Sequence, residues 1–227
     1  MSVSAATKAL AGASAMGAVG TGAFYLGRDK GIPIAELIKT SNPNKRLISS
    51  SKALTDQAWK DAWKAYRDAY KSNNKNPLNL RDWDSLSKEG DQNAPQSLVE
   101  ACSSLREEKV SDDKSERYGL ALKYCTRNTL VKDIIEEGGE RVLLVKTSTK
   151  GTSAEWKAVW KSYKDDNTDN SKNLWSLNDW TSVKSGNDAP ESFMTQCESK
   201  AKEAEWDLKS KKYLEVNKYC TSLKSTT

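Results

Sequence analysis

The chain of 227 residues contains no histidine. This absence excludes the histidine-dependent Ser and Cys triads, the commonest general base, and zinc sites with histidine ligands. The four cysteines form no CxxC pair, which argues against a redox centre and against a cysteine zinc site. We therefore expect no enzyme, no cofactor and no metal site.

A broad excess of positive charge is also missing. Residues 1–50 hold six basic and two acidic side chains, whereas the rest of the chain holds thirty basic and twenty-nine acidic ones. A nearly neutral body does not favour a nucleic-acid partner, because such partners are bound through clustered Lys and Arg. Carboxylate pairs such as residues 112–113 and 136–137 have no second acid in a distinct environment, and we interpret them as solvated charge.

What the chain does contain is an internal repeat. Three aromatic residues recur after 97 residues: Trp59, Trp63 and Tyr66 return as Trp156, Trp160 and Tyr163. The shift is 95 residues for Cys102 and Cys197, and for the tetrapeptide of residues 123–126 and its copy at 218–221. The repeat predicts an N-terminal segment (1–31), a first module (32–128) and a second module (129–227).

The aromatic residues of each copy follow helical spacing. Positions i, i+4 and i+7 form one stripe of a helix, predicted over about residues 55–72 and 153–167. We interpret the six aromatic residues as core. The alternative is a ligand surface, because lysines flank the stripe and lysine with tryptophan can stack on bases or sugars.

Further helices are predicted after Pro95 and Pro190, in the short amphipathic segments 34–38 and 131–136, and around Tyr118. Periodicity does not decide whether residues 141–145 form a strand. The predicted fold is all-α: an N-terminal apolar helix followed by two repeated small helical bundles.

Residues 9–27 carry no charge and are just long enough to cross a membrane as a helix. Their composition is rich in Ala and Gly, so a cleaved signal peptide and a soluble helix remain open alternatives. A membrane anchor is the preferred interpretation, with the membrane as partner through residues 9–27. Five basic residues follow this segment within residues 28–46 and one precedes it, which favours modules on the cytoplasmic side.

The cysteines point the other way. Each module holds one pair with the same separation, Cys102 with Cys125 and Cys197 with Cys220. A bridge within each pair would close a loop of about 23 residues and stabilise the module by about 3 kcal/mol. Buried free thiols are the alternative. Because disulfides persist in oxidising compartments, we expect the modules to lie outside the cell.

Three segments are distinctive: the repeated Trp-Lys helix (residues 156–164), the helix start at 189–193 and the Lys-Tyr-Cys-Thr segment at 123–126. In these segments the chain resembles a paralogous family of uncharacterised membrane and surface proteins of haemotropic mycoplasmas. The resemblance implies a membrane-associated or exported protein involved in host contact or antigenic diversity, with no catalytic residues.

Together these observations predict a non-enzymatic, membrane-anchored, surface-displayed repeat protein at the cell membrane, with an unknown host or protein ligand. The alternative is a cytoplasm-facing, membrane-anchored scaffold with reduced thiols.

Overall fold

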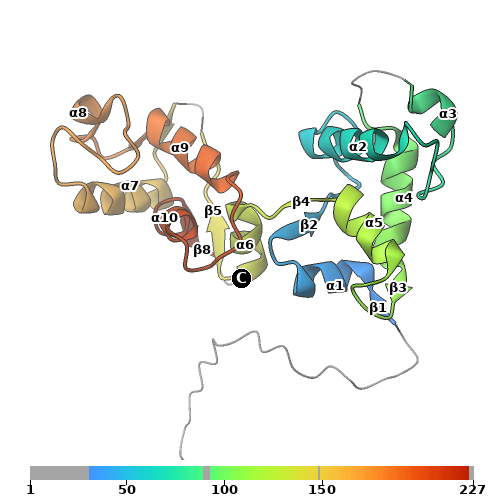
Figure 1. Ribbon diagram of the computed structural model, residues 1–227. Helices are drawn as coiled ribbons and strands as arrows, with labels where there is room; N and C mark the ends of the chain where they lie inside the picture. Colours follow the sequence, from blue (N-terminus) through green and yellow to red (C-terminus); the bar gives the residue numbers. More distant parts are fainter. Residues whose placement is uncertain (1–30, 89–92, 148, 225–227) are drawn as a thin grey trace, which may run out of the picture. The chain divides into compact units, whose positions relative to one another are not determined.

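The computed structural model describes residues 31–88, 93–147 and 149–224 (Figure 1). In chain order the elements of the first repeat are β1 (Ile32–Pro33), α1 (Ile34–Ser41), β2 (Lys45–Leu47), α2 (Gln57–Tyr70), α3 (Trp83–Leu86), α4 (Gln96–Glu107), β3 (Lys109–Val110), α5 (Glu116–Tyr124) and β4 (Thr126–Asn128). Those of the second are α6 (Val131–Gly138), β5 (Arg141–Leu143), β6 (Lys150–Gly151), α7 (Ala154–Asp166), α8 (Trp180–Val183), β7 (Ala189–Pro190), α9 (Glu191–Ala201), α10 (Lys211–Tyr219) and β8 (Thr221–Leu223).

The helices form where the periodicity of the sequence places them. Both aromatic helices begin at a side-chain cap: Asp56 accepts a hydrogen bond from the N–H of Ala58 (2.9 Å) before α2, and Ser153 accepts one from the N–H of Trp156 (3.3 Å) before α7. Such caps satisfy backbone donors that a helix start leaves unpaired. The aromatic stripe of each helix then faces the interior of its module.

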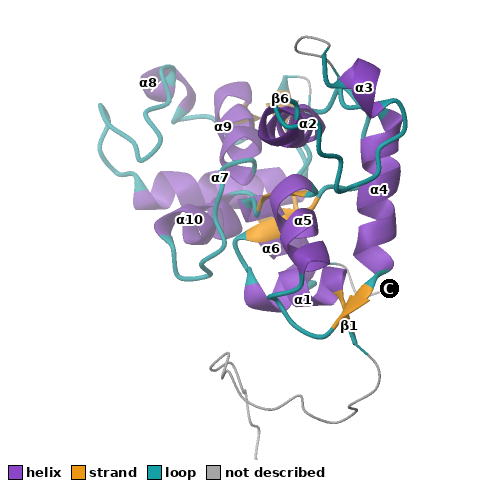
Figure 2. Cartoon of the chain, turned by 45° about the vertical axis from the view of Figure 1, so that its right-hand side comes forward, coloured by secondary structure: helices purple, strands orange, loops and turns teal. Residues whose placement is uncertain are grey.

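The prediction of an all-α fold is wrong. About 49% of the described residues are helical and 12% lie in strands, which are orange in Figure 2. These strands form four two-stranded antiparallel sheets among the described residues. The pairs are β1 with β3, β2 with β4, β5 with β8, and β6 with β7. Each strand has only two or three residues, which is too short to show the alternation by which strands are recognised in a sequence.

Two of these sheets join the strand that follows the first helix of each repeat to the end of that repeat. In the first repeat Lys45 pairs with Asn128, and in the second Arg141 pairs with Leu223. Since Asn128 and Leu223 are 95 residues apart, Arg141 is the structural counterpart of Lys45, at a shift of 96. The strand that follows the first helix is therefore offset by one residue from the aromatic helix, where the shift is 97.

Two hydrophobic clusters divide along the repeat. The first runs from Ile34 to Cys125 and the second from Val131 to Cys220. Large aromatic side chains dominate both, and burying them is the main apolar contribution to stability. The predicted boundary at residues 128–129 falls between the two clusters, although the exact limits of the modules stay predictions.

The prediction of a membrane-spanning helix also has to be corrected. Within the part of the chain that the structure describes, no helix is long and apolar enough to cross a bilayer. The longest has 14 residues, whereas a span needs about 20. The segment for which the anchor was predicted, residues 9–27, lies outside the described residues, so the membrane is not part of the function proposed below.

Candidate functional site

A disulfide closes each module. Cys102 and Cys125 are joined at an S–S distance of 1.95 Å, and Cys197 and Cys220 at 2.07 Å, with Cα–Cα distances of 5.4 Å in both. Each bridge ties the middle of the longer helix, α4 or α9, to the residue that ends α5 or α10. All four sulfurs are buried. Two structural disulfides indicate an oxidising environment, as for extracellular or secreted proteins.

The six aromatic residues singled out in the sequence lie in the core rather than on a binding surface. None is more than 3% exposed: Trp59, Trp63, Tyr66, Trp156, Trp160 and Tyr163. Their ring contacts repeat between modules, since Tyr66 meets Tyr124 edge-on at 5.1 Å and Tyr163 meets Tyr219 at 5.2 Å. With both faces covered by other side chains, these rings offer no stacking platform to a ligand.

The two buried tyrosines also fix the loop that follows each aromatic helix, a role that the sequence did not reveal. In the second module, Tyr163 donates to Asn173 Oδ1 (2.8 Å) and accepts from the N–H of Trp175 (2.9 Å). In the first, Tyr66 and Asn76 form the corresponding bond at 2.9 Å. Burial raises the pKa of Tyr66 and of Tyr163 to about 12. Neutral hydroxyls bonded on both sides hold the loops and do no acid–base chemistry near pH 7.

The lysines beside the aromatic stripe are largely neutralised by acidic neighbours. Lys64 lies 2.6 Å from Asp68, and Lys161 lies 2.6 Å from Asp165, each one helical turn away. Lys164 donates instead to the carbonyl of Gly186 (2.7 Å). The two ion pairs cancel charge that a polyanion would need, whereas Lys164 keeps its charge because a carbonyl is neutral.

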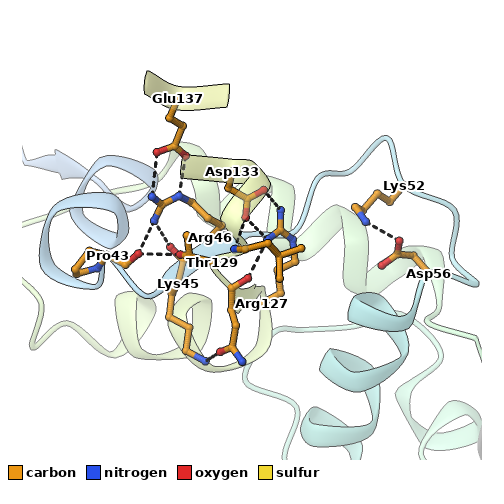
Figure 3. A network of polar contacts seen from close by, with 11 residues as sticks. Pro43, Lys45, Arg46, Lys52, Asp56, Arg127, Thr129, Asp133 and Glu137 are labelled. Atoms are coloured by element: carbon orange, nitrogen blue, oxygen red, sulfur yellow. Dashed lines mark hydrogen bonds and ion pairs between the residues drawn. The ribbon is translucent and has the colours of Figure 1, made fainter. Parts of the chain in front are cut away.

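A polar network joins the end of the first module to the start of the second (Figure 3). Thr129, which is 1% exposed, lies at its centre. Its N–H donates to the carbonyl of Asn44 in the first module (2.9 Å), and its own carbonyl accepts from the N–H of Glu205 in the second (2.9 Å). One backbone residue is thus tied to both modules.

Two arginine–carboxylate pairs reinforce this junction. Arg127 binds both carboxylate oxygens of Asp133, at 2.5 and 2.9 Å. Arg46 binds both oxygens of Glu137, at 2.7 and 3.0 Å. Burial raises the pKa of Asp133, but the hydrogen bonds from Arg127 and from the N–H of Leu130 outweigh burial, so this pKa lies below its ordinary value. A carboxylate held ionised between two donors is structural and is not a general acid.

Neither pair was singled out in the sequence. Arg46 and Glu137 are 91 positions apart, and no local spacing connects them. Glu137 belongs to one of the adjacent acidic pairs interpreted above as solvated charge, and the structure gives it a specific partner. Among the described residues no group of His, Cys, Asp and Glu side chains could hold a metal ion.

A surface groove recurs at the same place in both modules, between the first helix, the strand after it and the end of the disulfide-bearing helix. The first groove, of about 400 Å³, is lined by Ala35, Glu36, Ile38, Lys39, Lys45, Arg46, Leu47 and Arg106. The second groove, of about 480 Å³, is lined by Lys132, Leu143, Leu144, Val145, Lys146, Thr147, Cys197, Glu198, Ala201 and Lys202. Basic side chains outnumber acidic ones in both.

The two grooves differ in what reaches them. In the first, Glu137 of the next module reaches Arg46 and lies 3.9 Å from Lys39. The counterpart of Arg46 in the second module is Val142, which is 40% exposed. Because Leu143, Leu144 and Val145 line the second groove, it is the more apolar of the two, and it is the candidate binding site of the described chain.

Comparison with protein-family models, with curated proteins and with solved structures finds no match to this chain.

Proposed function

We propose that the chain is an exported, non-enzymatic repeat protein whose two disulfide-stapled modules are displayed outside the cytoplasm and bind a protein partner there. The observation that carries the proposal is the buried disulfide in each module. A bridge of this kind persists where thiols are not kept reduced. Contact with a host, or diversity of an exposed antigen, is the biological role that best suits such a protein and that the mycoplasma resemblance implies.

The way in which the copies differ supports a binding role. The aromatic core is kept in both modules, whereas exposed positions change in character. Val145, 82% exposed, corresponds to Ser49, and Trp206, 53% exposed, corresponds to Ser111. A constant interior that presents different surfaces is typical of binding and antigenic scaffolds, since function is determined by surface sites and not by the fold.

The catalytic alternative has little physical support. Two described hydroxyls donate to carboxylates, Ser171 to Asp169 (2.8 Å) and Tyr219 to Asp166 (2.5 Å). Hydrogen bonds hold the pKa of both carboxylates below the ordinary value, which makes them weak bases. The tyrosines that deviate from their ordinary pKa are shifted upward, chiefly by burial.

The redox state of the cysteines in native cells tests the proposal. Cells are treated with a membrane-permeable alkylating agent before lysis, and the chain is digested without reduction. We expect the peptide that contains Cys197 to remain linked to the peptide that contains Cys220, with neither alkylated. Alkylation of both cysteines would refute the exported state and favour the cytoplasm-facing scaffold.

Protease treatment of intact cells tests the location independently. We expect the modules to be cut at exposed loops while cytoplasmic markers survive. Survival of both modules next to cleavage of known exterior proteins would contradict display outside the cell. Because disulfides slow proteolysis, the same digestion repeated on lysed cells controls for intrinsic resistance.

A further inference from the structure

We propose that the second groove binds an acidic, partly apolar segment of a protein partner. This inference rests on the proposed function and specifies its binding site. It depends on three features of the described residues: a carboxylate that already reaches the first groove, a rigid apolar wall in the second, and an excess of lysine around that wall.

The first groove shows how such a segment is held. Glu137 projects from α6 of the following module, and both of its oxygens are bound by Arg46. The guanidinium is itself oriented by the carbonyls of Pro43 (2.9 Å) and Lys45 (2.8 Å) (Figure 3). A bidentate, pre-oriented arginine is a specific carboxylate receptor. Within this one chain, the groove of a module therefore already takes an acidic side chain from a neighbouring unit.

The second groove lies at the equivalent place in its module, but it lacks an arginine at the position of Arg46. Its counterparts of Ala35 and Arg106 are Lys132 and Ala201, so at these two positions the first helix gains a positive charge and the far helix loses one. The other two basic side chains, Lys146 and Lys202, lie after β5 and at the end of α9. The counterpart of Arg46 is Val142, so no arginine stands at this position, and the apolar surface of the groove comes from Leu143, Leu144 and Val145. A partner of this groove must therefore offer both carboxylates and apolar side chains.

The wall of the second groove is held in place from inside the module. The N–H of Leu144 donates to the carbonyl of Cys220 (2.9 Å), and the carbonyl of Val145 accepts from the indole of Trp156 (3.1 Å). Thr147 donates to the carbonyl of Lys150 (2.9 Å). The exposed Val145 side chain thus stands on a backbone fixed by the core. A preformed apolar surface loses little entropy when a partner covers it.

The charges around this wall favour an acidic occupant. Lys132, Lys146 and Lys202 line the groove against one acid, Glu198. Lys132 has no ion pair with any residue in the described ranges. Lys146 and Lys202 pair with acids that are 55% and 49% exposed. Exposed pairs of this kind contribute little and exchange easily, so a partner's carboxylates can take their place.

A peptide fits these observations better than a sulfated polysaccharide or a nucleic acid. Leu143, Leu144 and Val145 give the groove an apolar wall for which a polyanion has no counterpart. The carboxylate that reaches the first groove belongs to a protein. The competing occupants are therefore outcomes of the test, namely a polyanion or a second copy of this chain.

The test uses the full chain, labelled with ¹⁵N, and two synthetic peptides of ~12 residues, long enough to pass through the groove at about 3.3 Å per residue. One contains Glu, Leu and Gly, and the other has Lys at every Glu. We expect the acidic peptide to shift the amide signals of Val145, Lys146 and Ala201 with a Kd of about 1 mM or lower, and the basic peptide to shift none. Added salt weakens the interaction.

Charge reversal provides the matched comparison. The variant with Lys132→Glu, Lys146→Glu and Lys202→Glu is expected to weaken binding about tenfold or more. The control variant reverses three exposed lysines outside the groove and retains wild-type affinity within about twofold: Lys75→Glu, Lys172→Glu and Lys209→Glu. Thermal unfolding and intact mass confirm that both variants fold with their disulfides formed.

Four results would overturn the proposal. They are equal binding of both peptides, shifts that lie outside the second groove, equal losses in the two variants, and no shift at all in the wild-type chain. Heparin that displaces the peptide and binds more tightly would assign the groove to a polyanion. Concentration-dependent dimerisation that the charge reversal abolishes would assign it to a second copy. Any of these outcomes leaves the exported state to be decided by the cysteine and protease experiments.

Discussion

Removing one disulfide is expected to destabilise one module and to leave the other unchanged. The change is Cys197→Ala with Cys220→Ala, and its matched counterpart is Cys102→Ala with Cys125→Ala. Both bridges close loops with a separation of 23 residues. For a loop of that length, the chain-entropy relation gives a loss of about 3.4 kcal/mol at 25 °C. Because the two loops have the same length, the two variants should lose the same free energy of unfolding.

This loss is large compared with the stability of a small domain. Free energies of unfolding are about 5–15 kcal/mol. For a unit of roughly 100 residues, each kcal/mol lowers the melting temperature by about 4–8 °C. If the two aromatic clusters unfold separately, one of two transitions should move down by more than about 10 °C while the other stays in place.

Differential scanning calorimetry and tryptophan fluorescence in urea measure these changes. Reduction of the wild-type chain provides a second route, in which both transitions move together. Losses below about 1 kcal/mol in both variants would refute the reasoning that the bridges constrain the unfolded chain. A single transition that shifts by the same amount in either variant would instead show that residues 31–224 unfold as one cooperative unit.

Three further predictions concern single side chains. Tyr163→Phe should lower the free energy of unfolding by about 1–3 kcal/mol, because it leaves a buried N–H without a partner; urea titration should show no comparable loss for Tyr213→Phe. Gly151→Ala should lower the free energy of unfolding by about 1–3 kcal/mol in the same assay, because the added Cβ would lie 2.6 Å from a carbon of Trp156. The control Gly119→Ala, whose added Cβ has nothing within 4 Å, should be neutral or stabilising. Tyr66 and Tyr163 have a pKa of about 12 when folded, so each should contribute up to about 2.7 kcal/mol to the free energy of unfolding. This contribution should be complete below about pH 10 and lost as the pH rises to about 12. Tyrosinate absorbance that rises fully near pH 10 while the fold persists would contradict this.

Much of the helical framework could be predicted because its signal is local. The stripe of Trp59, Trp63 and Tyr66 has the period of a helix with one buried face, and its repetition 97 residues later removes the doubt that a single match would leave. The equal separation of the cysteines likewise pointed to the pairs that the structure joins.

The strands were missed because their signal is not local. Residues 45–47 read as a short basic segment, and they form a strand only because residues 126–128 lie beside them. A strand of three residues also lacks the alternation that would reveal it. The all-α expectation failed for this reason and not because the helices were misplaced.

The binding groove depends on positions that the sequence separates even further. Lys132 lies in α6 and Lys202 directly after α9, and only the fold brings them to one groove. The one-residue offset between the aromatic helix and β5 also hid the equivalence of Arg46 and Val142. A single constant shift would have matched Arg46 to Leu143 and obscured the loss of the carboxylate receptor.

The pairing of β2 with β4 has a consequence for how such a chain can grow. Neighbouring strands lie about 4.8 Å apart, so the strand by which the backbone leaves the first unit lies beside the strand that follows its first helix, α1. A unit whose last strand is paired within the unit can be copied in tandem without disturbing the packing inside it. Since β8 closes the second unit in the same way as β4 closes the first, a third copy grafted after Leu223 should fold, and each addition would present one more groove on which selection can act.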